Sequence, residues 1–176
     1  MVWALFRVGS GRGIGWRVFL STFEKQLDSK RRIVVPQEFR ATASVPSSTS
    51  GFDGVFCFPS IEAECLEGGG QALFSQYQSV IEELPLLDPL RSALEFTVLG
   101  GMRQLPFDSA GRIVLPEGLC EEMGITDWVA LVGLGDRFQI WSLDAYKAHR
   151  ETQRQAAREG LANLRMAQRT AKTGTA

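Results

Sequence analysis

One short segment occurs twice in the 176-residue sequence, with the second copy 80 positions after the first. Residues 28–39 read DSKRRIVVPQEF and residues 108–119 read DSAGRIVLPEGL, so six of the twelve aligned positions are identical. The identical pairs are Asp28/Asp108, Ser29/Ser109, Arg32/Arg112, Ile33/Ile113, Val34/Val114 and Pro36/Pro116. Two copies are too few for a solenoid, which needs three or more stacked units, so we expect two half-domains that pair with each other.

Each copy has the residue pattern of a turn, a short strand and a short helix. Asp and Ser favour a turn because their side chains bond nearby backbone N–H groups. The apolar residues 33–35 and 113–115 predict short buried strands. Pro36 and Pro116 suit the first position of a helix, and Gly124 is placed to end the second helix.

Further strands are expected on both sides of each copy. The β-prone segments are residues 19–27, 54–58, 96–107, 128–132 and 137–141, with Gly100-Gly101 as a candidate break within 96–107. Gly133-Leu134-Gly135-Asp136 predicts a hairpin turn between the last two of these strands.

An acidic segment with helical patterning lies between the copies. A first helical piece is expected over residues 62–66, ended by the three glycines at 68–70. A second piece is expected over residues 72–84, where apolar residues recur on one face. Proline ends this second piece and begins a third over residues 89–94.

These elements divide the chain into five segments. Residues 18–66 and 96–145 are expected to form the two repeats, and residues 67–95 the acidic helical linker between them. Residues 1–17 are expected to be a flexible N-terminal lead. Residues 146–176 are expected to form a helical basic tail with a disordered end.

The net charge of −1, from 19 basic and 20 acidic residues, argues at first against a nucleic-acid-binding protein. The charges are unevenly distributed, however: residues 25–40 carry +3, 53–95 carry −7, 96–142 carry −3 and 143–176 carry +4. A DNA phosphate responds to charges within a Debye length of about 8–10 Å rather than to the molecular sum. Net charge therefore does not exclude DNA binding. Arg112 lies in an acidic part of the chain, so its contact with DNA must depend on its position rather than on surrounding positive charge.

The cysteine and histidine content argues against metal sites and nucleophilic catalysis. The chain has an odd number of cysteines, and no two of them form a Cys-x-x-Cys pair; they are Cys57, Cys65 and Cys120. We therefore expect them to serve as small apolar residues in a reducing compartment rather than as disulfides or metal ligands. The single histidine, His149, has no partner for a transition-metal site and is expected on a solvated helix face. We therefore expect no cofactor, no metal and no catalytic residue. No apolar run approaches the roughly 20 residues of a transmembrane helix.

The two copies resemble the paired signatures of the MraZ family. Residues 27–36 resemble the first signature and residues 108–116 the second, and residues 129–141 resemble the block that closes the second repeat. The resemblance covers residues 18 to about 150. It implies an α+β fold in which two tandem AbrB-like (SpoVT-AbrB) swapped-hairpin repeats form a β-barrel core, with a helical insert and a helical C-terminal tail.

The resemblance also implies a function. Proteins of this family are sequence-specific DNA-binding transcriptional regulators of the bacterial division and cell-wall gene cluster. They bind upstream direct repeats in double-stranded DNA as ring-shaped homo-oligomers. The implied location is the cytoplasm, in association with the nucleoid, with no membrane and no small-molecule substrate.

The family's DNA contacts centre on an Asp-x-x-x-Arg motif, which this chain has twice. The expected DNA-binding residues are Arg32 and Arg112, with Lys30 and Arg31 as additional phosphate contacts. The residues expected to orient the motif are Asp28, Asp108, Ser29 and Ser109. Arginine suits this role because its planar fork can pair with phosphate or with the O6 and N7 atoms of guanine.

One position departs from the family pattern. The first motif usually has Gly before its Arg, as the second has Gly111 here, but this chain has Arg31. A residue other than Gly at positive φ costs roughly 1 kcal/mol or more. Either the first loop takes another conformation, or the position does not require Gly.

Three other interpretations remain open at this point. Each Asp–Arg pair could only lock its turn. The chain could instead be a structural or protein-interaction ring whose acidic insert, residues 53–95, docks a partner. Asp28 and Asp108 could also form a catalytic carboxylate pair, although the neighbouring Arg should keep each Asp ionised and unfit as a shared-proton acid.

Overall fold

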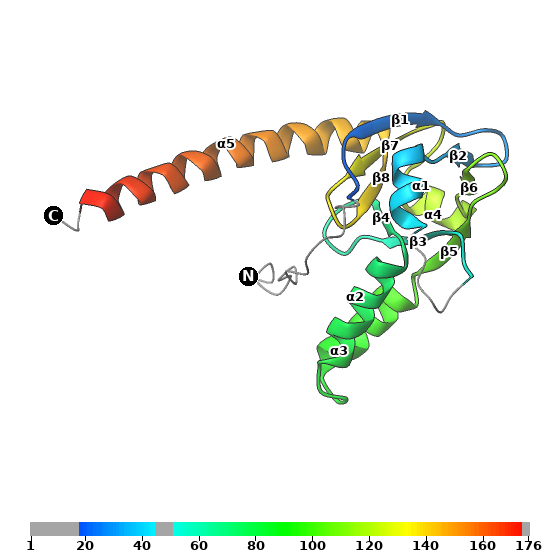
Figure 1. Ribbon diagram of the computed structural model, residues 1–176, viewed down its shortest axis with the longest axis horizontal. Coiled ribbons are helices and arrows are strands. Elements are labelled where there is room, and N and C mark those ends of the chain that lie inside the picture. The colour runs from blue at the N-terminus through cyan, green and yellow to red at the C-terminus, as the bar shows by residue number, and fades with distance from the viewer. Residues whose placement is uncertain (1–17, 45–50, 174–176) are drawn as a thin grey trace.

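The computed structural model describes residues 18–44 and 51–173 of the chain. In this part the protein is a mixed α+β structure with a six-stranded sheet, a two-stranded ribbon and packed helices (Figure 1). The expected flexible lead, residues 1–17, and the last residues of the tail, 174–176, lie outside the described residues.

The strands are β1 (Thr22–Gln26), β2 (Arg32–Val34), β3 (Gly54–Pro59), β4 (Leu66–Gly69), β5 (Arg103–Pro106), β6 (Arg112–Val114), β7 (Trp128–Gly133) and β8 (Phe138–Ser142). The helices are α1 (Gln37–Ala43), α2 (Gln71–Glu82), α3 (Pro89–Leu94), the π-helical turn η2 (Glu95–Leu99), α4 (Glu117–Glu122) and α5 (Leu143–Thr173).

The sheet topology joins the two copies by an exchange of strands. The strand order in the large sheet is β1-β7-β8-β4-β3-β5, and every neighbouring pair is antiparallel. The first strand of each copy thus pairs with the hairpin of the other copy, β1 with β7 and β5 with β3. The order reads the same from both edges when the copies are exchanged, so the two half-domains are related by an approximate twofold axis.

The large sheet is open, so the prediction of a closed β-barrel is wrong for the described residues. β1 and β5 lie at its two edges and do not pair with each other. Each edge strand leads into a turn at Asp28 or Asp108 and continues as β2 or β6, which pair as a separate ribbon. The chain leaves the sheet at these turns because the Asp side chains take up backbone N–H groups.

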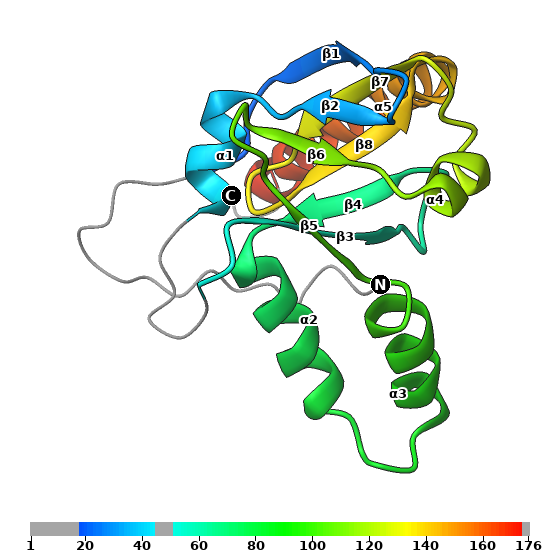
Figure 2. The same cartoon turned by 90° about the vertical axis from the view of Figure 1, so that its right-hand side faces the viewer.

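The main core lies between the sheet and the β2–β6 ribbon (Figure 2). Ile33 and Ile113 face each other across the ribbon and are fully buried. Phe39 of α1 packs against Phe138 of β8, with ring centroids 5.3 Å apart, and Leu119 of α4 joins the same cluster. Because side chains alternate along a strand, the inner face of the ribbon is anchored in this core and its outer face is left open.

The helix expected over residues 62–66 is wrong, and the three glycines that follow do not end a helix. Leu66–Gly69 is strand β4, which pairs with both β3 and β8. A Cβ atom on Gly68 would lie 2.6 Å from the ring of Phe138, and one on Gly69 would lie 2.8 Å from Leu73. Glycine is therefore used here for close packing of a buried strand against its neighbours.

The strand expected over residues 96–107 is confirmed only in its second half, at β5. Asp88 caps α3 by accepting a backbone N–H at 2.8 Å, and the chain remains helical through η2. Val98 of η2 is fully buried and clusters with Phe58 and Leu73. This contact holds the segment in a helical conformation that local β propensity does not predict. Together α2 and α3 form a hairpin that projects away from the sheet (Figure 2).

A buried carboxylate joins β4 to the neighbouring elements. Glu67 is only 4% exposed and accepts hydrogen bonds from Ser60 Oγ and Tyr77 Oη, each at 3.1 Å. Arg137 Nε lies 3.4 Å from Glu67 Oε2. Burial, and then the charge of Glu67, raise the pKa of the Tyr77 hydroxyl, so it stays a donor. The network links α2, β4 and the start of β8.

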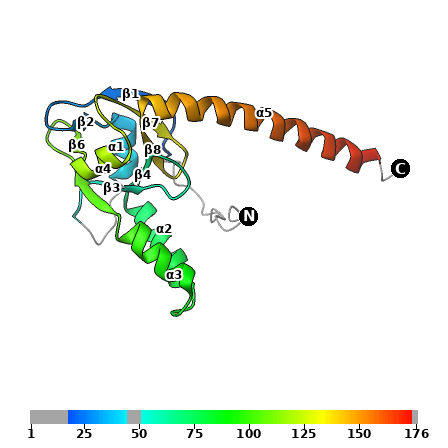
Figure 3. The same ribbon diagram turned by 180° about the vertical axis from the view of Figure 1, so that it is seen from behind.

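The helical tail is confirmed as α5, which extends far from the body of the protein (Figures 1 and 3). Trp141 and Tyr146 pack its first turns against the sheet, and His149 stacks on Trp141 with ring centroids 4.4 Å apart. His149, expected on a solvated helix face, is therefore partly covered by Trp141. No helix in the described part of the chain is long and apolar enough to cross a membrane.

Candidate nucleic-acid interface

The first Asp-x-x-x-Arg segment forms a tight turn between β1 and β2. Asp28 Oδ1 accepts the backbone N–H groups of Lys30 and Arg32, each at 2.9 Å. Asp28 Oδ2 lies 2.6 Å from both Nε and Nη2 of Arg32. One carboxylate thus fixes the backbone of the turn with one oxygen and the arginine side chain with the other.

The second segment repeats this geometry between β5 and β6. Asp108 Oδ1 accepts the N–H groups of Ala110 and Arg112 at 2.9 Å, and Asp108 Oδ2 accepts Nε–H of Arg112 at 2.7 Å. The hydrogen bond from the Arg112 backbone N–H is the largest cause that lowers the pKa of Asp108; desolvation opposes it, and the Arg112 side chain lowers the pKa further. The Arg32 contacts lower the pKa of Asp28 in the same way. Both carboxylates therefore remain ionised around neutral pH.

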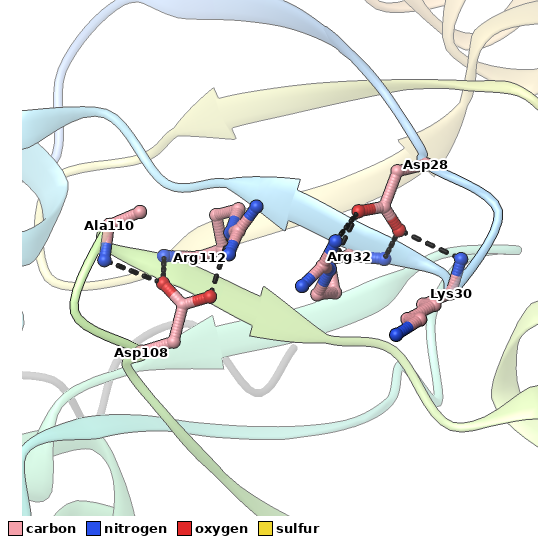
Figure 4. Close-up of polar contacts among 6 residues, drawn as sticks. All are labelled: Asp28, Lys30, Arg32, Asp108, Ala110 and Arg112. Atoms are coloured by element: carbon pink, nitrogen blue, oxygen red, sulfur yellow. Dashed lines mark hydrogen bonds and ion pairs between the residues drawn. The ribbon is translucent and has the colours of Figure 1, made fainter.

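The register of the ribbon brings the two motifs together. Arg32 of β2 lies opposite Val114 of β6, and Val34 lies opposite Arg112, about the central Ile33–Ile113 pair. Both Asp–Arg pairs lie on the outer face of the ribbon (Figure 4). Each arginine side chain is about one-third exposed. Two oriented guanidinium groups, 80 residues apart in sequence, thus share one open surface.

The other predicted site residues have smaller parts in this geometry. Lys30 is exposed beside the first turn and takes part through its backbone N–H. Ser29 and Ser109 are exposed, and their hydroxyls make no hydrogen bond to any residue in the described part of the chain. Within each described turn, the side-chain contacts to the arginine and to the backbone N–H groups are made by the aspartate.

The structure decides between the alternatives for Arg31. Arg31 has a φ of +57° and Gly111 a φ of +71°, so both turns have the left-handed conformation. The backbone of each is held in the same way: Arg31 N–H donates to Asp28 O and Gly111 N–H to Asp108 O, each at 2.9 Å. The position therefore does not require glycine, and the first turn keeps its shape at the expense of some backbone strain.

The two turns also differ in which residue supplies the arginine that links the turn to the helix of the other copy. Arg40 of α1 lies against Gly111, where a Cβ atom would meet its guanidinium group, and donates to Val35 O at 3.2 Å. The equivalent of Arg40 in the second copy is Cys120 of α4. Arg31 extends instead toward α4, where its Nη2 lies 3.7 Å from Glu117 Oε2. Each turn thus contacts the helix of the other copy through one arginine, supplied by the helix in one case and by the turn in the other.

Sequence reasoning did not identify Arg40 as part of the site. The signal was present in the repeat, since an offset of 80 aligns the basic Arg40 with the small Cys120 and the basic Arg31 with Gly111. Burial is the first cause that raises the pKa of the Cys120 thiol, and the positive charge of Arg31 lowers it. All three cysteines are buried and unpaired, as their sequence pattern predicts. No cluster of metal-ligating side chains occurs among the described residues.

Comparison with known proteins decides the family. The family model described as "MraZ protein, putative antitoxin-like" matches residues 98–168. The "Transcriptional regulator MraZ" of Phenylobacterium zucineum is 68% identical over 155 residues, which cover 88% of this chain and 94% of that protein. The chain belongs to the MraZ family.

Two other MraZ proteins, one of them much less similar, agree. The "Transcriptional regulator MraZ" of Caulobacter vibrioides is 67% identical over 88% of this chain and 96% of its own length. The protein of the same name from Xanthobacter autotrophicus is 36% identical over 141 residues, which cover 80% of this chain and 87% of that protein. The family suggested by the paired Asp-x-x-x-Arg motifs is therefore confirmed over most of the chain.

Proposed function

We propose that this chain is a sequence-specific DNA-binding transcriptional regulator that contacts the major groove of double-stranded DNA with the outer face of the β2–β6 ribbon. The observation that carries the proposal is the pair of Asp-oriented arginines, Arg32 and Arg112, on one exposed face. A two-stranded ribbon fits the major groove, and arginine is the side chain that most often reads guanine there. The similar MraZ proteins carry the name of transcriptional regulators.

The Asp–Arg contacts support a binding role beyond locking the turn. The backbone of each turn is already fixed by Asp Oδ1 and by main-chain hydrogen bonds. The additional bond from Oδ2 to Nε holds the guanidinium of Arg32 or Arg112 in place. An arginine held before binding loses less side-chain entropy on contact with DNA.

The distribution of charge favours the same face. Lys30 is exposed in the turn that leads to Arg32, and we propose that it contacts a phosphate on that side of the groove. We propose the same for Arg31, whose guanidinium would exchange its 3.7 Å contact with Glu117 for the phosphate. The α2–α3 hairpin, which carries much of the acidic insert, projects away from the ribbon (Figure 2). Salt screens charges increasingly with distance, so a hairpin that projects away from the ribbon repels a phosphate there less than adjacent acidic residues would.

We propose that the chain acts as a ring-shaped homo-oligomer on direct repeats upstream of the division and cell-wall genes. A single ribbon face is small, and linked copies gain affinity when their spacing matches repeated sites. This arrangement explains how a chain with a net charge of −1 could bind DNA tightly. We propose that the protein acts in the cytoplasm, in association with the nucleoid.

The test is the affinity for the DNA upstream of the chain's own gene, measured by fluorescence anisotropy and gel shift with the full chain. The Arg32→Ala/Arg112→Ala double variant should lose specific binding, because each bidentate arginine–base contact contributes about 1–3 kcal/mol. The matched control, Arg154→Ala/Arg158→Ala, removes the same charge from the exposed part of α5. Equal affinities for the ribbon variant and the wild type would contradict the proposal.

A second candidate function is a protein-interaction ring in which the acidic insert docks a partner. The observation that favours it is the exposure of Leu86, Leu87 and Leu90 at the tip of the α2–α3 hairpin. The same experiment separates the two functions. DNA binding that is weak, insensitive to DNA sequence and unchanged by the arginine substitutions would favour the interaction ring.

A further inference from the structure

Two exposed valines lie in the middle of the proposed DNA-binding face. Val34 is 45% exposed and Val114 is 49% exposed, whereas their neighbours Ile33 and Ile113 are fully buried. β-Branched residues favour strands, but the core contacts of the ribbon are already made by its inner face. Burial in this protein therefore does not explain why the two outward positions are apolar.

The register places each valine beside both arginines. Val34 follows Arg32 by two residues on β2, which puts the two side chains on the same face about 7 Å apart. Val34 also lies directly opposite Arg112 on β6, at a cross-strand Cβ separation of about 5 Å. Val114 has the equivalent place between Arg112 and Arg32. The outer face is thus a two-by-two array in which arginines and valines alternate.

We propose that Val34 and Val114 contact the 5-methyl groups of thymines in the major groove, beside the bases contacted by Arg32 and Arg112. The inference rests on the proposed function and names the DNA chemistry that the site selects. Among the groups that base pairs present in the major groove, the thymine methyl is the apolar one. An isopropyl group held between two guanidinium groups offers that methyl an apolar partner where the arginines offer none.

The spacing of the array relates the thymines to the arginine contacts. Successive bases of one strand are 3.4 Å apart along the helix axis, so the spacing of about 7 Å between Arg32 and Val34 corresponds to two base-pair steps. The approximate twofold axis through Ile33 and Ile113 relates the two valines. A bound site should therefore have two thymines, one for each valine, each within about two steps of a base contacted by arginine.

The test begins with selection of bound sequences from a random duplex library by the full chain. Each thymine of the selected site is then replaced by deoxyuridine, which lacks the 5-methyl group and keeps the same hydrogen-bonding edge. We expect two positions at which the replacement weakens wild-type binding about fourfold, the factor that corresponds to burying one methyl-sized group. The remaining thymines serve as internal controls and should be insensitive.

A double-mutant cycle, in which valine substitutions are combined with replacement of thymine by deoxyuridine, assigns each methyl group to a valine. Val34→Ala should weaken binding to thymine DNA and abolish the effect of deoxyuridine at one position only, and Val114→Ala should do the same at the other. Val34→Thr keeps the β-branched shape, so it serves as a second variant that preserves the strand.

The outcomes separate this inference from the proposed function. If deoxyuridine is neutral at every position, or if Val34→Ala and Val114→Ala weaken thymine and deoxyuridine DNA equally, the valines do not read methyl groups and the inference is overturned. If the library yields no enriched site, or if Arg32→Ala/Arg112→Ala binds as the wild type does, the proposed function itself fails. Loss of binding in the arginine variant together with neutral deoxyuridine leaves the proposed function standing and removes only the inference.

Discussion

Substitution of Gly111 tests the reciprocal contact between the turns and the helices. In Gly111→Ala the new residue must keep a φ of +71°, which costs roughly 1 kcal/mol for a residue with a Cβ atom. The Cβ atom also meets the guanidinium of Arg40, so Arg40 must move and lose its 3.2 Å hydrogen bond to Val35 O. Loss of that bond adds about 1 kcal/mol.

The expected destabilisation is therefore about 2 kcal/mol, which lowers the melting temperature of a chain of this size by about 4–8 °C. The measurement is thermal and urea unfolding followed by circular dichroism. The control is Gly118→Ala on α4, where a Cβ atom meets no other atom within 4 Å. This control should unfold at or slightly above the wild-type temperature, because alanine is the better helix former.

A double variant tests the exchange itself. Gly111→Arg combined with Arg40→Cys gives the second turn the arrangement that Arg31 and Cys120 have in the first. The double variant should be more stable than Gly111→Arg alone, because removal of Arg40 frees the space that the new side chain needs. The reasoning is refuted if Gly111→Ala unfolds as the wild type does, or if the double variant is no more stable than Gly111→Arg.

Three further predictions concern the carboxylates. The double variant Asp28→Asn/Asp108→Asn removes two negative charges from the DNA-binding face. We nevertheless expect its affinity for DNA to fall about tenfold, because the arginines lose their orienting contacts and must be ordered on binding. Tighter binding than that of the wild type in an anisotropy titration would contradict this expectation. The pKa values of Asp28 and Asp108 are lowered in the folded protein, so their contribution to stability is fully present above the unfolded value of about 3.9 and is lost as pH falls through the folded value. Melting temperatures measured from pH 3 to pH 8 should therefore decline below about pH 4 less steeply in this double variant than in the wild type. Glu67→Ala removes the acceptor of Ser60 Oγ and Tyr77 Oη and one of the carboxylates beside Arg137, so it should cost about 2 kcal/mol in urea unfolding. A loss no larger than that of an exposed control such as Glu151→Ala would show that the network is not stabilising.

Much of the site could be predicted because its geometry is local. The paired Asp-x-x-x-Arg segments predict turns, since an Asp side chain reaches backbone N–H groups two and four residues ahead. Gly124, with a φ of +60°, ends α4 as expected. The hairpin turn at residues 133–136 also joins β7 and β8 as predicted. In each case the residues that determine the structure are neighbours in sequence.

The missed features depend on contacts between distant residues. Strand β4 contains two glycines and a glutamate, which have low β propensity. The strand packs against Phe138, which lies about 70 residues further along the chain. The expected barrel is absent from the described residues because β2 and β6 pair with each other and do not extend the edges of the large sheet. The place of Arg40 over Gly111 likewise requires the fold of both copies. Periodicity and turn chemistry carry no information on such pairings.

The central claim, that the outer face of the β2–β6 ribbon binds DNA, is tested most directly by hydrogen exchange with and without DNA. The full chain would be mixed with duplex DNA from upstream of its own gene, and amide exchange followed peptide by peptide. The account predicts slower exchange in the peptides that contain residues 28–35 and 108–115 and no change in those from the α2–α3 hairpin. Protection confined to the basic helix α5 or to that hairpin, with the two turns unchanged, would contradict it.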